Sequence, residues 1–153
     1  MADTEAFREF KQGLDRLRDS DGERALEHMR RAVELEEHNP FYVSYLGLAL
    51  ARSRRRWGEA EELCDSALKM KRDQPQLYLN LAEVYVAAGR REDAAETLLR
   101  GMKYAQRDIR LKLMLSKLIV RRRPVLPFLA RESFLNRQLG KWRHRALEYL
   151  GSI

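Results

Sequence analysis

Residues 75–108 read PQLYLNLAEVYVAAGRREDAAETLLRGMKYAQRD, and this stretch decides the fold. Its first half places apolar residues at i, i+3, i+4 and i+7, the spacing that gathers them on one face of a helix. They are Tyr78, Leu81, Ala82 and Tyr85. Gly89 and Arg90 interrupt the pattern, and a stripe of small and medium-sized residues follows at Ala94, Leu98 and Gly101. Because small residues let helices approach closely, the stretch predicts a hairpin of two packed helices.

The same pattern occurs twice more upstream. Residues 6–39 carry Gly13 in the first helix, and residues 40–74 carry Leu46 and Gly47 there, with a turn one residue longer. The small-residue stripe of the second helix recurs as Ala25, Met29 and Ala32, and again as Ala60, Cys64 and Ala67. Three consecutive units of one pattern indicate a repeat protein, because each unit buries its apolar face against its neighbours.

This pattern resembles the tetratricopeptide repeat, written W-x2-L-G-x2-Y…A-x3-F…P over 34 residues. Residues 75–108 match it with Tyr78 at Trp, Leu81-Ala82 at Leu-Gly, Tyr85 at Tyr, Ala94 at Ala and Leu98 at Phe. The resemblance implies an all-α fold, a right-handed α-α superhelix (solenoid) of three helical hairpins at 6–39, 40–74 and 75–108. A capping helix over 109–123 would complete a domain spanning 4–123, and 124–153 would form a basic, proline-containing tail with an amphipathic helix.

Composition argues against several function classes. Cys64 is the one cysteine, so neither an intrachain disulfide nor a CxxC metal site is expected. The three histidines fall in separate units, no phosphate-binding glycine loop occurs, and Cys64 is expected to be a buried core thiol. We therefore predict a non-catalytic protein with no metal, no cofactor and no small-molecule substrate. The acidic, polar N-terminus lacks a secretory signal, which predicts a cytoplasmic location.

The resemblance also implies a concave groove lined by the first helices, which family members use to bind peptides or helices. The predicted groove residues are Phe10, Leu14, Tyr45, Leu48, Arg52, Asn80, Glu83, Arg110 and Lys117. The N-terminal half would be apolar and the C-terminal half polar and basic, which suits a partner segment with a hydrophobic end and an acidic end. Phe10, Leu14 and Leu48 could equally be buried between helices, since packing uses the same spacing.

One partner class is excluded by the same resemblance. Members that bind chaperone tails hold the terminal carboxylates with Lys, Asn and Arg at five defined first-helix positions. Here those positions hold Phe10, Leu14, Tyr45, Gln76 and Asn80. We therefore do not expect binding to chaperone tails, and the protein partner stays unidentified.

Charge divides the chain unevenly. Residues 109–153 carry 11 Lys and Arg against 2 Asp and Glu, a net of +9, whereas the chain as a whole carries +7. The basic patch comprises Arg121, Arg122, Arg123, Arg137, Lys141 and Arg145. It supports an alternative function, binding to an anionic membrane surface or to nucleic acid, which we rank below a protein partner.

Two further roles for the tail stay open. Its amphipathic helix can dock on the solenoid and leave its charges solvated. Alternatively, residues 125–129, with Phe128 as anchor, can enter the protein's own groove, or that of a second copy in a domain-swapped homodimer.

Overall fold

The computed structural model describes residues 4–105 and 107–120 of the chain. This part contains seven α-helices and no strand, which confirms the all-α prediction. The helices are α1 (Glu5–Arg18), α2 (Gly22–Leu35), α3 (Pro40–Arg54), α4 (Trp57–Met70), α5 (Pro75–Ala87), α6 (Arg91–Tyr104) and α7 (Ile109–Val120). None of them is long and apolar enough to cross a bilayer.

Local sequence sets the ends of these helices. Thr4 and Asp21 cap α1 and α2, because each side-chain oxygen accepts a hydrogen bond from a backbone N–H three residues later. Asn39 caps α3, whose first residue is Pro40. The longer turn between α3 and α4 is accommodated by Arg55, which adopts a left-handed conformation with φ of 53°. These signals set the starts of α1, α2 and α3 and the end of α3.

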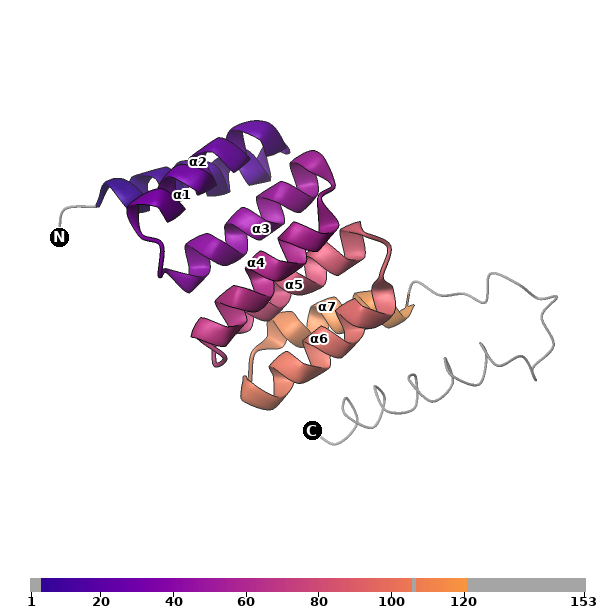
Figure 1. The fold of residues 1–153 in the computed structure, drawn as a ribbon. Helices are drawn as coiled ribbons and strands as arrows, with labels where there is room; N and C mark the ends of the chain where they lie inside the picture. Colours follow the sequence, from indigo (N-terminus) through magenta and orange to yellow (C-terminus); the bar gives the residue numbers. More distant parts are fainter. Residues whose placement is uncertain (1–3, 106, 121–153) are drawn as a thin grey trace, which may run out of the picture.

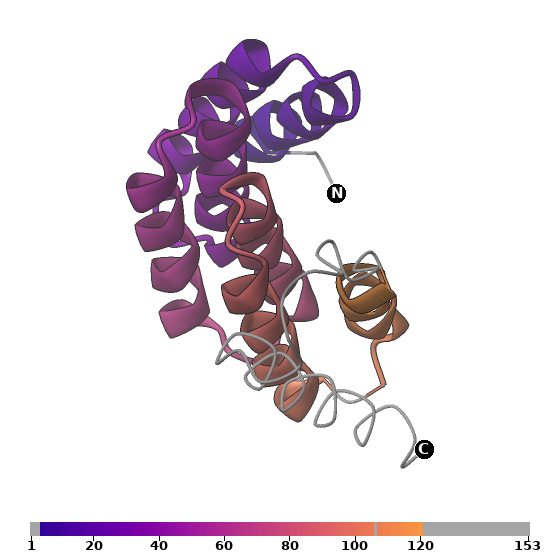
Figure 2. The same cartoon turned by 90° about the vertical axis from the view of Figure 1, so that its right-hand side faces the viewer.

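The helices stack as successive antiparallel hairpins, α1–α2, α3–α4 and α5–α6, with α7 against α6 and α5 (Figure 1). Figure 2 shows that the stack curves, with α1, α3, α5 and α7 on its inner side and α2, α4 and α6 on its outer side. We call the inner side the concave face. The first helices of the hairpins thus share one face, as the repeat pattern predicts.

The small-residue stripes lie at the centre of the packing. Ala25, Met29, Ala60, Cys64, Ala94 and Leu98 are all completely buried. A Cβ atom on Gly47 would lie 2.8 Å from the carbonyl oxygen of Ala60, so α3 and α4 can approach this closely because residue 47 is glycine. Gly101 plays the same role in α6, where a Cβ atom would lie 2.7 Å from the ring of Tyr78.

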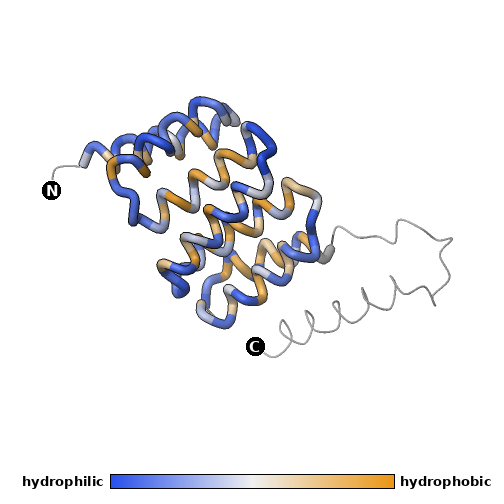
Figure 3. The backbone as a smooth tube through the Cα atoms, in the orientation of Figure 1, coloured by the Kyte–Doolittle hydropathy of each residue, from blue (hydrophilic) through white to orange (hydrophobic). Residues whose placement is uncertain are grey.

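The helices differ in hydropathy along the stack. Apolar residues are more concentrated in α3 and α5, which lie in the middle, than in α1 and α2 at the N-terminal end (Figure 3). At the other end, α7 buries Leu111 and Leu115 and leaves Ile109 and Leu113 exposed. The predicted capping helix over 109–123 is thus described to Val120, and the rest of it, together with the tail, lies outside the described residues.

Candidate binding face

The structure places the predicted groove residues at two depths. Phe10, Leu14, Tyr45 and Glu83 are half-buried, and Arg52, Arg110 and Lys117 are exposed. Leu48 and Asn80 are buried, with 3% and 0% of their surface exposed. These two therefore support the concave face from beneath instead of offering a side chain to a partner. The basic patch at 121–123, 137, 141 and 145 lies outside the described residues.

At the α1–α3 end of the concave face, aromatic rings pack on one another. The Phe10 ring lies 4.7 Å from the Tyr42 ring and 5.3 Å from the Tyr45 ring, meeting the latter edge to face. Phe7, one helical turn before Phe10, is 42% exposed. Phe7, Phe10, Leu14 and Tyr45 form what we call the aromatic end. Phe10, Leu14 and Tyr45 pack against the core, and part of each side chain also reaches the surface.

Tyr45 lies where the aromatic end meets charged groups. Burial raises the pKa of its hydroxyl and Glu83 adds to this, whereas Arg110, Arg18 and Arg52 lower it. The hydroxyl is therefore protonated at neutral pH and can donate a hydrogen bond. Among the described residues it has no hydrogen-bond partner.

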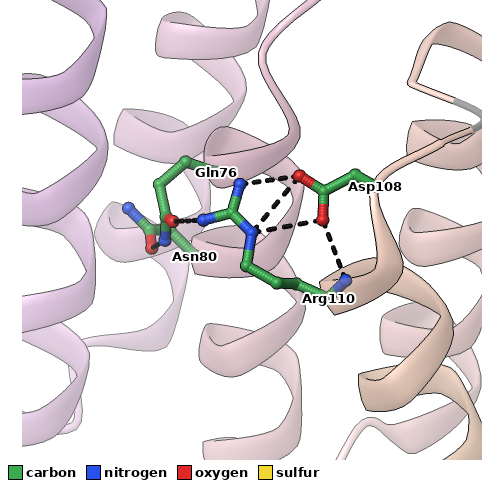
Figure 4. Close-up of polar contacts among 4 residues, drawn as sticks. All are labelled: Gln76, Asn80, Asp108 and Arg110. Carbon is green, nitrogen blue, oxygen red and sulfur yellow. Dashed lines mark hydrogen bonds and ion pairs between the residues drawn. The ribbon is translucent and has the colours of Figure 1, made fainter.

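At the α5–α7 end, hydrogen bonds link α7 to α5 (Figure 4), and one further bond continues from α5 to α3. Asp108 accepts from Nε of Arg110 at 3.1 Å and from Nη2 at 2.7 Å. Nη1 of Arg110 donates to Oε1 of Gln76 at 2.9 Å. Nε2 of Gln76 donates to Oδ1 of Asn80 at 2.9 Å, and Nδ2 of Asn80 donates to Oγ of Ser44 at 3.0 Å. These five residues, the polar end, run from the exposed Arg110 to the buried Asn80 and Ser44.

A second polar contact spans the same helices. Arg52 of α3 pairs with Glu83 of α5 and also donates to the carbonyl oxygen of Leu17 in α1 at 3.5 Å. Both charged side chains are more than a third exposed. The pair thus fixes the orientation of Arg52 on the concave face and contributes little to stability, because solvent screens exposed ion pairs.

Of the polar end, Asp108 was not predicted to lie on the concave face, and Ser44 and Gln76 stand at first-helix positions that only the family resemblance implies for binding. Two of them carry a local signal. Gln76 and Asn80 stand at i and i+4 of one helix, a spacing at which amides pair. Asp108 precedes the first apolar residue of α7 and accepts from the backbone N–H of Arg110 at 2.9 Å, as helix-capping aspartates do. Ser44 has no such signal, because its partner Asn80 lies 36 residues away.

The side chains that could carry other chemistry do not line this face. Cys64 is buried as predicted, and burial raises its pKa to about 12, so the thiol is protonated at neutral pH. His28 is partly buried, with Nδ1 2.8 Å from a carboxylate oxygen of Glu9. No group of three or more His, Cys, Asp or Glu residues in the described part of the chain is placed to hold a metal ion.

Known proteins match the chain in family pattern and in fold. Residues 51–118 match the family model described as tetratricopeptide repeat. No curated relative matches the chain. Among solved structures, the first tetratricopeptide domain of Spaghetti (RPAP3), bound to the HSP90 peptide SRMEEVD, has a TM-score of 0.62 and 16% identity. The match covers 77% of this chain and 95% of that one.

Two other solved structures match comparably. The TPR2B domain of yeast Sti1, in complex with pHsp70, has a TM-score of 0.62 and 19% identity, covering 76% of this chain and 98% of that one. The crystal structure of MamA has a TM-score of 0.64 and 17% identity, covering 97% of this chain and 80% of that one. At these identities the likeness concerns the fold. Sequence pattern, helical stacking and the match over residues 51–118 agree that the chain is built of helical hairpins similar to tetratricopeptide repeats.

Proposed function

We propose that this protein is a non-catalytic interaction module, and that residues 4–123 bind a segment of another protein across the concave face. Tetratricopeptide domains are protein-interaction modules, and the solved domains of Spaghetti and Sti1 hold chaperone peptides. The observation that carries the proposal is the juxtaposition of half-buried aromatic rings with arginines on one face. Aromatic and arginine side chains are the residues enriched where protein interfaces gain most of their affinity.

The structure favours a partner other than a chaperone tail. At the family's chaperone-binding positions, Phe10 and Leu14 supply no hydrogen-bond donor, and Phe10 packs against Tyr42 and Tyr45. Asn80 is completely buried and uses its amide on Gln76 and Ser44. Such a face suits a segment that presents apolar side chains to the aromatic end and polar or acidic ones to the polar end.

The test is to select binding peptides from a random library on the full-length protein and to measure their affinity for two matched variants. Phe7→Ser removes a 42%-exposed ring from the aromatic end, and Leu35→Ser removes a 40%-exposed side chain from α2 on the outer side. We expect Phe7→Ser to weaken binding about tenfold and Leu35→Ser to leave it unchanged. Equal effects of the two variants, or no effect of either, would refute binding at the concave face.

The alternative function rests on the net charge of +9 over residues 109–153. If this segment binds an anionic membrane or nucleic acid, affinity will fall steeply with salt, because each neutralised phosphate releases counterions. Neutralising Arg121, Arg122 and Arg123 together would then abolish binding to vesicles or to nucleic acid. Binding that resists salt and depends on Phe7 favours the concave face instead.

A further inference from the structure

We propose that a polar pocket on the outer side of the stack binds the ammonium group of a lysine side chain from another protein. The pocket has a volume of about 210 Å³ and is lined by Asp65 of α4, Tyr85 of α5, and Asp93, Glu96, Thr97 and Arg100 of α6. We call it the outer pocket. Binding there does not depend on the proposed function, because α4 and α6 lie on the side of the stack opposite the concave face (Figure 2).

The first observation is a hydroxyl without a partner at the wall of this pocket. Only 4% of Thr97 is exposed, and its hydroxyl makes no hydrogen bond within the described part of the chain. Buried polar side chains nearly always have a partner, and a threonine hydroxyl in a helix commonly bonds a carbonyl of the preceding turn. Since Thr97 lines the outer pocket, its hydroxyl is available to a polar group that enters.

The other repeats show that this position is otherwise occupied by a side chain with a partner. When the small-residue stripes are aligned, Thr97 in α6 corresponds to His28 in α2 and to Leu63 in α4. His28 places Nδ1 2.8 Å from a carboxylate oxygen of Glu9, and Leu63 packs against the core. Of these three equivalent side chains, only Thr97 has a polar atom that no other described residue satisfies.

The second observation is the charge of the lining residues. Asp65, Asp93 and Glu96 supply three carboxylates against the one guanidinium of Arg100, a net of −2 at neutral pH. Asp93 pairs with Arg90 at 2.6 Å, and Asp65 lies 3.9 Å from Arg100. Glu96 has no ion-pair partner among residues 4–105 and 107–120. At least one negative charge is therefore left for a cationic ligand.

The acceptors favour an ammonium group over other cations. Thr97 and Glu96 of α6 and Asp65 of α4 offer oxygens from two different helices. An ammonium group donates three hydrogen bonds in separate directions, whereas the donors of a guanidinium lie in one plane. A metal ion is disfavoured, since the described residues contain no group of three or more His, Cys, Asp or Glu placed to hold one.

Tyr85 supplies the apolar wall that a lysine side chain requires. Its residue is 8% exposed, and its hydroxyl donates to Glu61 at 2.7 Å. Burial raises the pKa of this hydroxyl, and Glu61 and Asp65 raise it further, so the hydroxyl stays protonated at neutral pH. The ring is thus held in place at the pocket, where it can contact the methylene groups of a lysine while the ammonium group reaches the acceptors.

The test is an NMR titration of the isotope-labelled full-length protein with Nα-acetyl-lysine methylamide. We expect saturable shifts of the backbone amides at residues 65 and 93–97, with a dissociation constant on the order of 1 mM. The Nε-acetylated probe, which lacks the charge, should give no such shifts, and the arginine equivalent should bind more weakly. An absence of saturable shifts, equal shifts with the acetylated probe, or tighter binding of the arginine probe would each overturn the proposal.

Three variants test the assigned side chains. Thr97→Val should weaken probe binding about tenfold without lowering stability in urea, because the hydroxyl has no partner to lose. Glu96→Gln should weaken it by a smaller factor, because solvent screens this exposed carboxylate. Glu62→Gln removes an exposed carboxylate of α4 outside the pocket and should have no effect. Binding that survives Thr97→Val unchanged, or that Glu62→Gln weakens as much as Glu96→Gln, would contradict the assignment.

Two further variants of the full chain identify the source of the lysine and the surface. Lys141 lies outside the described residues, and Lys141→Gln should leave the affinity for the probe unchanged. Tighter binding to this variant would assign the pocket to the chain's own lysine and overturn the assignment to another protein. Phe7→Ser should also leave the probe bound, and a loss would place the probe on the concave face. Failure of the probe leaves peptide binding at the concave face untouched.

Discussion

At the aromatic end of the concave face, Phe10, Tyr42 and Tyr45 hold their places by packing on one another, whereas at the polar end a chain of hydrogen bonds runs from Arg110 to Ser44. Packing is not directional, so the aromatic side chains can bury most of their surface in the core and still contact a partner with the rest. Hydrogen bonds are directional, so each polar side chain has its orientation fixed by the next. The aromatic end therefore supplies contact area, and the polar end supplies orientation.

The largest expected effect concerns the close packing of α3 on α4, which supports both ends. We expect Gly47→Val to destabilise the protein by about 1–3 kcal/mol, because its side chain would meet the Ala60 carbonyl and the Cys64 sulfur. Gly58 in α4 has nothing within 4 Å of a built Cβ atom and is the matched control. Gly58→Ala should be neutral or stabilise by up to about 1 kcal/mol. Urea denaturation measures both, and similar losses in the two variants would contradict this packing.

A comparable effect is expected from breaking the polar end at its buried member. Asn80→Ala leaves Ser44 Oγ and Gln76 Nε2 without their partner, which should cost about 1–3 kcal/mol. In the double variant with Ser44→Ala, the loss should be smaller than the sum of the single losses by about 0.5 kcal/mol or more. Additive losses would show that this hydrogen bond does not couple α3 to α5.

The exposed ion pair between Arg52 and Glu83 should contribute less to stability than the buried hydrogen bonds of Asn80. Arg52 and Glu83 are both more than a third exposed, so we expect Glu83→Gln to cost about 0–1 kcal/mol. The loss should shrink further at high salt, because salt screens exposed charges. A loss as large as that of Asn80→Ala, measured in the same urea series, would mean that the two polar contacts do not differ in burial as described.

The last prediction is that Cys64 does not react with thiol reagents in the native protein. Cys64 lies beneath the meeting point of the two ends, since its Sγ donates to the Ser44 carbonyl at 3.5 Å. Burial raises its pKa to about 12, so the thiol should stay protonated and unlabelled in the native chain at pH values well below 12. A thiol-reactive dye should label it only when urea unfolds the protein. Rapid labelling at neutral pH would show that α3 and α4 separate locally.

Sequence reasoning located the helices well and the site residues unevenly. The spacing of Tyr78, Leu81 and Tyr85 predicts one apolar helix face, and Asn39 followed by Pro40 predicts the start of a helix. Both predictions depend only on near neighbours along the chain. The burial depth of a side chain does not follow from its neighbours along the chain. Leu14 and Leu48 stand at the same repeat position, yet Leu14 is half-buried at the end of the stack and Leu48 is buried in its middle. The helical periodicity predicts the direction in which a side chain points, but it does not predict which other residues bury it.

By itself, the sequence determined that this protein is a stack of helical hairpins, because turn residues and apolar spacing act over a few neighbours along the chain. Only the tertiary structure decided that Asn80 is buried, that Ser44 meets it across 36 residues, and that Arg110 is held in place on the surface. These outcomes depend on which helices lie side by side and how closely they pack. Hydrogen bonds between distant residues exist only once that packing is complete.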